Sequence, residues 1–182
     1  MPATHAVLIR GINVGGRNPV PMAALRTRLE EAGLGEVRTY IQSGNVLADG
    51  AGRSTSEVGD TVVGVLAEAF GVDTVVVTVD AHALRSAVDD APDGFGSEPA
   101  VYHYDAAFLR PGVDAGDAAA AFGIRDGVDT VWAGESVVYF RRLSAQRTRS
   151  RMSTVMASPV YQDMTIRNWR TTTTLVGMLD HD

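Results

Sequence analysis

The sequence predicts an α+β protein made of two similarly organised halves and a C-terminal helix. Residues 1–80 alternate between short apolar runs and segments with helical spacing, in the order strand, helix, strand, strand, helix, strand. A comparable order begins again about 95 residues further along the chain. With 182 residues, 45% of them hydrophobic, the chain is long enough to build a core in each half.

The first half begins with an apolar strand at residues 6–9, which leads into a glycine-rich loop. Pro21 is expected as the first residue of a helix that carries Leu25 and Leu29 on one face and ends at Gly33. Residues 36–42 alternate like a strand. The tight turn at 43–45 then leads into a third strand at 46–49, so that the two strands form a hairpin.

A second helix is expected over residues 56–70, with Ser56 as its N-cap and Gly71 at its end. A strand at 74–79 and a short helix at 81–90, capped by Asp80, follow it. The resulting order is the split βαβ, or ferredoxin-like, pattern.

In the second half, strands are expected at 100–110, 129–132 and 136–142, and helices at 114–122 and from residue 152. No closing strand is evident. Instead, Asn168 is expected to cap a final helix over 169–179, with Trp169 as a packing anchor. The loop at 91–99 divides the chain, so the predicted domains are residues 1–92 and 93–182, two ferredoxin-like halves with a C-terminal helix.

The composition excludes several kinds of chemistry. The chain contains no cysteine, which rules out disulfides, thiolate nucleophiles and cysteine-bound zinc and favours a cytoplasmic protein. All 16 basic residues are arginine, so a Schiff base or a P-loop lysine is also excluded. We expect no secretory leader and no membrane-spanning segment, because no apolar run is long enough.

Charge is distributed unevenly along the chain. Residues 1–140 have a net charge of −10, whereas residues 141–182 have a net charge of +4. This C-terminal excess includes a run of arginines that could bind a polyanion: Arg141, Arg142, Arg147, Arg149 and Arg151. The alternatives are a solvated loop, or a segment that docks on the protein's own acidic part.

The glycine-rich loop is the strongest candidate for a binding site. A strand, a glycine loop and a helix N-terminus together can present backbone N–H groups to an anion, and Arg10 and Arg17 could add bidentate contacts. The segment is neither a Walker loop nor a dinucleotide fingerprint. The structural alternative is a tight connection in which Asn13 and Asn18 satisfy the loop's own backbone.

A second segment, residues 42–45, is expected to lie beside this loop. The strands at 6–10 and 36–42 are expected to be parallel neighbours, which would bring their C-terminal ends together. Open sheets usually bind ligands at such ends. The predicted ligand-binding residues are Arg10, Gly11, Asn13, Gly15, Gly16, Arg17, Gln42, Ser43, Asn45 and Arg167.

Other candidate residues for chemistry are few. His103 and Asp105 share one face of their strand, as a base and its orienting partner or two metal ligands would. A structural histidine fits the same pattern, and no catalytic residue or metal site is assigned. Arg167 could equally pair with an acidic residue inside the protein.

Three sequence blocks, RGINVGG (10–16), TYIQSGN (39–45) and TIRNWRT (165–171), resemble the bacterial family known as domain of unknown function 1697. The resemblance spans almost the whole chain and implies a fold of two ferredoxin-like halves. It implies no reaction, substrate or catalytic residue.

The sequence therefore predicts a protein that binds a small anionic or nucleotide-like ligand at the glycine-rich loop. Two alternatives remain open: an enzyme that uses this loop as a phosphate or oxyanion cradle, with Arg167 or His103, and a module that binds nucleic acid through its C-terminal arginines. Cofactor and oligomeric state are not indicated.

Overall fold

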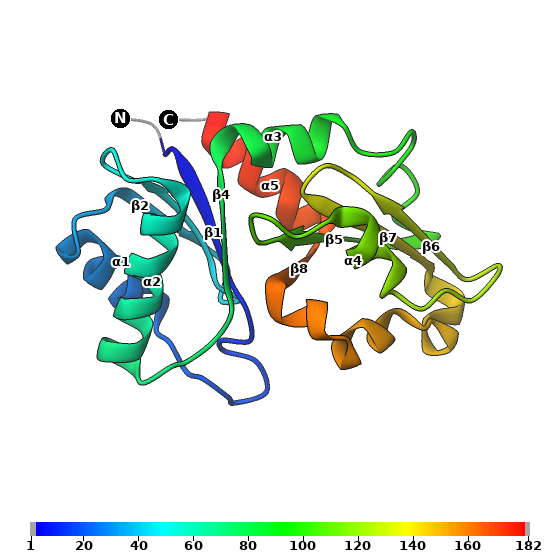
Figure 1. The fold of residues 1–182 in the computed structure, drawn as a ribbon, viewed down its shortest axis with the longest axis horizontal. Helices are drawn as coiled ribbons and strands as arrows, with labels where there is room; N and C mark the ends of the chain where they lie inside the picture. The colour runs from blue at the N-terminus through cyan, green and yellow to red at the C-terminus, as the bar shows by residue number, and fades with distance from the viewer. Residues whose placement is uncertain (1–2, 181–182) are drawn as a thin grey trace. The chain divides into compact units, whose positions relative to one another are not determined.

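A computed structural model describes residues 3–180 of the chain (Figure 1). The chain divides into two compact units. The first contains the residues up to Leu84 and those from Leu175 onward, and the second contains Arg85–Thr174. Each unit is a four-stranded antiparallel sheet with its own helices, so the predicted α+β fold with two ferredoxin-like halves is confirmed. The domain division at residues 92 and 93 stays a prediction.

The first unit has the expected order of elements. It contains β1 (His5–Ile9), α1 (Met22–Glu31), β2 (Gly35–Tyr40), β3 (Asn45–Asp49), α2 (Thr55–Phe70) and β4 (Val76–Asp80). The sheet order is β2-β3-β1-β4, and every neighbouring pair is antiparallel. The prediction that the first strand and the strand at 36–42 are neighbours is therefore wrong. They run in the same direction, but β3 lies between them because the hairpin inserts it there.

Local sequence explains how the two helices of the first unit begin and end. Ser54, and not Ser56, caps α2: its hydroxyl accepts a hydrogen bond from the Glu57 amide, and the Glu57 carboxylate accepts one from the Ser54 amide. Gly71 ends α2 in the left-handed conformation. Pro21 is the N-cap of α1 and not its first helical residue.

One face of the first sheet packs against α1 and α2 (Figure 1). Its buried residues alternate along β1 and β3, as in Val7, Ile9 and Val46, and they meet the apolar stripes of the helices at residues such as Leu25 and Val62. The intervening residues of both strands, such as Leu8 and Leu47, are buried as well.

The second unit repeats this topology with different helices. It contains β5 (Tyr102–Leu109), α4 (Ala115–Ala120), β6 (Asp129–Ala133), β7 (Val137–Leu143) and β8 (Met164–Asn168), in the sheet order β6-β7-β5-β8. In place of the helix expected from residue 152, the chain forms two short 3₁₀ helices, Met152–Ala157 and Pro159–Asp163. Another 3₁₀ helix, Ser144–Arg149, precedes them. The expectation of no closing strand is wrong, since β8 pairs with β5 along its whole length.

The two remaining helices cross the boundary between the units along the chain. Helix α3 (Ala81–Asp89) begins after Asp80, whose carboxylate accepts a hydrogen bond from the Ala83 amide at 2.7 Å. Helix α5 (Trp169–Asp180) follows Asn168, whose side-chain oxygen accepts one from the Arg170 amide at 3.0 Å. Both predicted caps are confirmed. Among the described residues, no helix is long and apolar enough to cross a membrane.

Candidate functional site

The structure brings together the two segments of the first unit that the sequence predicts to contain ligand-binding residues. We call residues 10–18 and 40–45 the glycine corner. The Ile9 amide donates to the Gly44 carbonyl at 2.8 Å, and the Asn13 side-chain amide donates to the Gln42 carbonyl at 2.9 Å. Gly44 has φ +82°, and a Cβ there would lie 2.7 Å from the Ile9 carbonyl oxygen, so the corner closes only with glycine at this position.

Asn13 and Asn18 hold the loop in its conformation. The Asn13 side chain donates to the Val20 carbonyl at 2.8 Å and accepts from the Val20 amide at 2.7 Å. The Asn13 amide donates to the Asn18 carbonyl at 3.0 Å, and the Asn18 side chain donates to the Gly11 carbonyl at 3.2 Å. These two side chains thus serve the loop's own backbone, which is the structural alternative raised by the sequence.

The tip of the loop is open. Val14, Gly15, Gly16 and Arg17 are all exposed, and the Arg17 amide donates to the Val14 carbonyl at 3.0 Å. Gly15 and Gly16 have φ values of +57° and +75°, and nothing lies within 4 Å of where a Cβ would stand on either. Arg10 is half-buried at the base of the loop, where its amide donates to the Val75 carbonyl.

The second segment contributes mainly through its backbone. Asn45 is fully buried, and its side chain donates to the Tyr40 carbonyl and to the Ser43 hydroxyl, each at 3.1 Å. This anchoring holds Ile41 at φ +48°, an unusual conformation for a β-branched residue, with 51% of its surface exposed. Gln42 is exposed at the surface.

Arg167 belongs to the second unit, on β8. It is only 8% exposed and donates to the Thr165 hydroxyl at 2.9 Å and to the Ile166 carbonyl at 3.0 Å. Burial lowers the pKa of its guanidinium to about 10, because desolvation disfavours the charged form.

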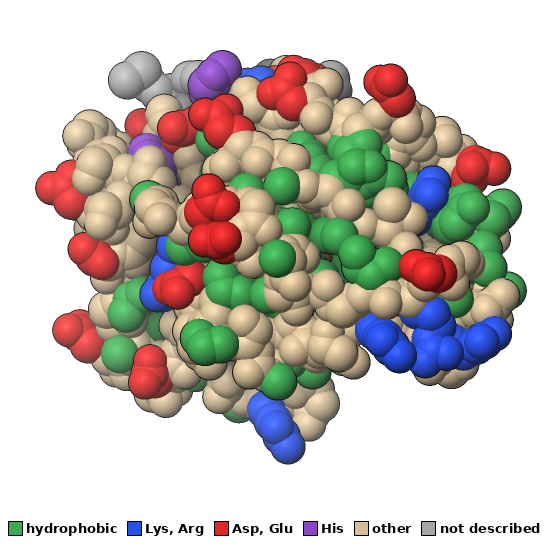
Figure 2. Space-filling view, turned by 45° about the vertical axis from the view of Figure 1, so that its right-hand side comes forward, with side chains coloured by type: hydrophobic (Ala, Val, Ile, Leu, Met, Phe, Trp, Pro, Cys, Tyr) green, Lys and Arg blue, Asp and Glu red, His purple; other side chains and the backbone are tan. Residues whose placement is uncertain are grey.

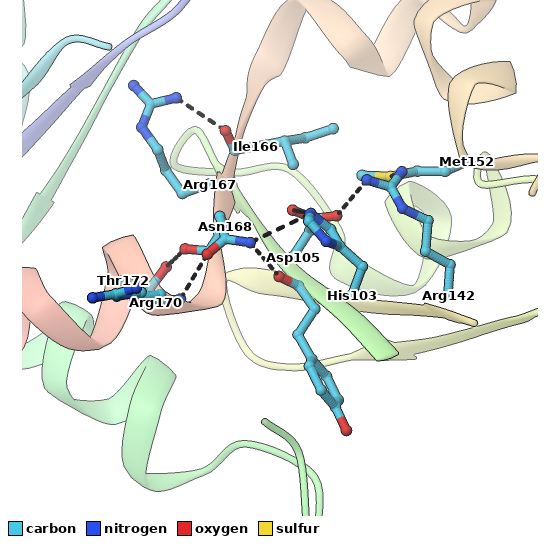
Figure 3. A network of polar contacts seen from close by, with 10 residues as sticks. His103, Asp105, Arg142, Met152, Ile166, Arg167, Asn168, Arg170 and Thr172 are labelled. Carbon is cyan, nitrogen blue, oxygen red and sulfur yellow. Dashed lines mark hydrogen bonds and ion pairs between the residues drawn. The ribbon is translucent and has the colours of Figure 1, made fainter. Parts of the chain in front are cut away.

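His103 and Asp105 share a face of β5, as the sequence predicts, and Figure 3 shows them in a polar network. His103 Nε2 lies 4.0 Å from Asp105 Oδ1 and 3.4 Å from the Asn168 side-chain nitrogen. Asp105 is 6% exposed, and the Arg142 guanidinium lies 3.6 Å from its Oδ2 atom. Burial raises the Asp105 pKa, whereas the charges of Arg142 and His103 oppose this increase.

Sequence reasoning missed the part that Arg142 plays in this network. Arg142 stands directly opposite His103 in the β5–β7 ladder, so the signal was the strand register and not the spacing along the chain. The described residues contain no group of three or more His, Cys, Asp or Glu side chains placed to hold a metal ion.

The arginine-rich segment divides into packed and exposed members. The Arg141 guanidinium lies 4.3 Å from the ring centre of Tyr102 and 5.4 Å from that of Trp132. Arg147, Arg149 and Arg151 are exposed on the 3₁₀ segment or next to it. Figure 2 shows several basic side chains gathered at the lower right of its view.

These features define a class: α+β proteins built from two ferredoxin-like units, the first of which carries a closed, glycine-rich corner after its opening strand. The chain belongs to the family described as "Protein of unknown function (DUF1697)", whose model matches residues 3–139. None of the curated proteins matches it.

A solved structure of similar fold is that of the conserved bacterial protein SP0830 from Streptococcus pneumoniae. The two chains are 24% identical and superpose with a TM-score of 0.79, over 98% of this chain and 99% of the other. At this identity the similarity establishes the fold alone.

Proposed function

We propose that the protein binds a small anionic ligand, such as phosphate or a nucleotide-like molecule, at the tip of the glycine corner. The observation that supports this function is the open backbone at Gly15 and Gly16. Both residues adopt positive φ with free space above them, so a ligand can approach the main chain closely. Arg17 lies beside them with its side chain exposed.

The internal hydrogen bonds of the loop favour this role. A flexible loop loses conformational entropy when it closes on a ligand, whereas a loop already held in its bound shape avoids most of that cost. Asn13 bridges the loop to Val20 and to Gln42 before any ligand arrives. We therefore assign Asn13, Asn18 and Asn45 to positioning, and the anion contacts to Arg17 and to the Gly15 and Gly16 amides, with Arg10 at the base.

Titration of ¹⁵N-labelled protein with inorganic phosphate and with pyrophosphate tests this proposal. We expect the amide resonances of Gly15 and Gly16 to shift saturably, and Arg17→Ala to weaken binding about tenfold, as loss of a charge-assisted hydrogen bond does. Arg28→Ala, at an exposed arginine of α1, should leave the affinity unchanged.

Glycine substitutions provide a matched control. Gly15→Ala and Gly52→Ala both place a side chain at positive φ with open space above it, so the backbone strain is comparable. Only Gly15→Ala should weaken phosphate binding. Equal behaviour of the two variants, or unshifted glycine amides at millimolar phosphate, would disprove the proposal.

The cysteine-free composition also supports a cytoplasmic location for the protein, which fractionation of cells that express a tagged copy would test. The two alternative functions have distinct signatures. Turnover of phosphoester or acyl-ester substrates would indicate an enzyme, and single-stranded nucleic acid binding that weakens steeply with salt would indicate a nucleic-acid module.

A further inference from the structure

The second unit contains a pocket of about 530 Å³ that no part of the proposed function uses. It lies where β5 begins and β8 gives way to α5. Asn168, the last residue of β8, pairs with Asp105, so residues 102–104 of β5 extend past the end of β8. The chain turns away into α5 at this point and leaves a hollow beside the free end of β5. We call it the aromatic pocket.

Three aromatic side chains line this pocket: Tyr102, Tyr104 and Trp169. Trp169 packs on the bare backbone of Gly96, where a Cβ would lie 2.3 Å from its indole nitrogen. The Phe95 ring meets the rings of Trp169 and Tyr104 edge-on, with centres 4.9 Å apart in both pairs. These contacts hold the aromatic walls in place before a ligand binds.

Tyr102 is held from a different direction. The Arg141 guanidinium lies 4.3 Å from the centre of its ring, a cation–π contact within one sheet. Tyr102 is half-buried, so part of its surface stays open to the pocket. Planar walls of this kind bind planar ligands by stacking, as they do in proteins that bind single-stranded nucleic acids.

Polar groups line the same pocket. Arg170 is exposed, and it forms no ion pair with any residue in the described range 3–180. His103 also lines the pocket, with 47% of its side chain exposed. The carboxylate behind it, that of Asp105, is buried and faces Arg142, so the accessible charge at the pocket is positive.

We propose that the aromatic pocket is a second binding site, which takes a small molecule that has both an aromatic ring and an anionic group. The ring lies against Tyr102 and Trp169, and the anion lies on Arg170. The volume falls within the range of about 300–1,000 Å³ that is usual for small-molecule sites, and a few polar groups among aromatic walls are typical of such sites. This site is independent of the glycine corner.

The chain offers a direct optical probe, because it contains only two tryptophans, Trp132 and Trp169. In a Trp132→Phe protein, Trp169 is the one remaining tryptophan, so tryptophan fluorescence reports on the pocket wall. We would titrate this protein with adenosine monophosphate, which carries both chemical features, and separately with adenosine and with inorganic phosphate. A Trp169→Phe protein, which retains Trp132, is the matched control.

We expect adenosine monophosphate to quench Trp169 saturably, adenosine to quench it with weaker affinity, and phosphate alone to leave it unchanged. Arg170→Ala should raise the Kd for adenosine monophosphate about tenfold and leave that for adenosine nearly unaltered. Arg147→Ala, an exposed arginine of the same unit that does not line the pocket, should change neither.

Thr173→Phe provides an independent check, because Thr173 lines the pocket and a larger side chain there occupies its volume. This variant should lose binding of both the nucleotide and the nucleoside. The proposal is overturned if Trp169 does not respond to millimolar adenosine, guanosine, cytidine or uridine monophosphate. It is also overturned if the Arg170→Ala and Thr173→Phe substitutions leave quenching the same as in the Trp132→Phe protein.

Discussion

The first unit presents its glycine corner outward, whereas the second unit has a pocket recessed beside the free end of a strand. In the glycine corner, the polar side chain of Asn13 turns inward to bind the backbone, and the open tip consists of Val14, Gly15, Gly16 and Arg17. In the aromatic pocket, the backbone recedes at Gly96 and side chains line the hollow.

The difference shows that one topology can offer two kinds of surface. Both units have a four-stranded sheet in which the opening strand lies between the third and fourth strands. In the first unit the loop after the opening strand carries the candidate site. In the second unit the candidate site lies at the start of the opening strand, β5. The neighbouring strand, β8, is too short to cover that end of β5.

The largest expected effect is that of Gly44→Ala, at the closure of the glycine corner. The added Cβ would meet backbone, the Ile9 carbonyl oxygen at 2.7 Å, and the residue has φ +82°. Left-handed strain and overpacking together should lower the free energy of unfolding by about 3 kcal/mol. Urea unfolding measures this, with Gly52→Ala as the control at φ +84° in open space. Similar losses in both variants would show that the corner is not tightly closed.

A smaller effect is expected for Gly96→Ala in the pocket. Here the Cβ would meet the Trp169 side chain at 2.3 Å and not the backbone, so the ring can move away at a cost of about 2 kcal/mol. The emission of Trp169 in a Trp132→Phe background should shift, because the indole leaves its packed position. An unchanged spectrum would mean that Gly96 does not position the pocket wall.

The smallest effect concerns Asp105, behind the pocket, and depends on pH. Burial raises the pKa of Asp105 in the folded protein above 3.8, the usual value that applies to the unfolded chain. At a pH between the unfolded and the folded pKa, the folded protein holds a proton that the unfolded chain has lost. The free energy of unfolding therefore decreases as pH rises through this window. Asp105→Asn removes this dependence and should gain stability relative to the natural chain as pH rises above 3.8.

Chemical unfolding of both proteins below and above this window provides the measurement. Asp126→Asn, at an exposed aspartate of the same unit, serves as the control. Parallel pH profiles for the natural chain and Asp105→Asn would show that the Arg142 contact fully offsets the burial of the carboxyl group.

Much of the fold could be predicted from local patterns. The apolar runs of β1 and β3, the cap at Asn168 and the stop at Gly71 each depend on neighbouring residues. Ser54 and Ser56 show the limit of such patterns, since both lie at the start of the same helix and only the Ser54 hydroxyl accepts the Glu57 amide hydrogen bond.

Strand β8 could not be predicted in the same way. It is five residues long, and it contains the polar residues Thr165 and Arg167 at buried positions. Such a segment resembles a loop in sequence, and its pairing with β5, about 60 residues away, makes it a strand. The wrong neighbour assigned to β1 has the same origin, because sheet order depends on contacts between distant segments.

The sequence alone determined the α+β class, the repeated order of elements and the glycine loop with its arginines, because propensity, capping and alternation act over a few residues. The tertiary structure decided which strands are neighbours, that Asn13 faces inward, and that aromatic residues from two separate segments line one pocket. Those outcomes arise from burial and pairing between residues far apart in the chain, and such interactions leave no local pattern in the sequence.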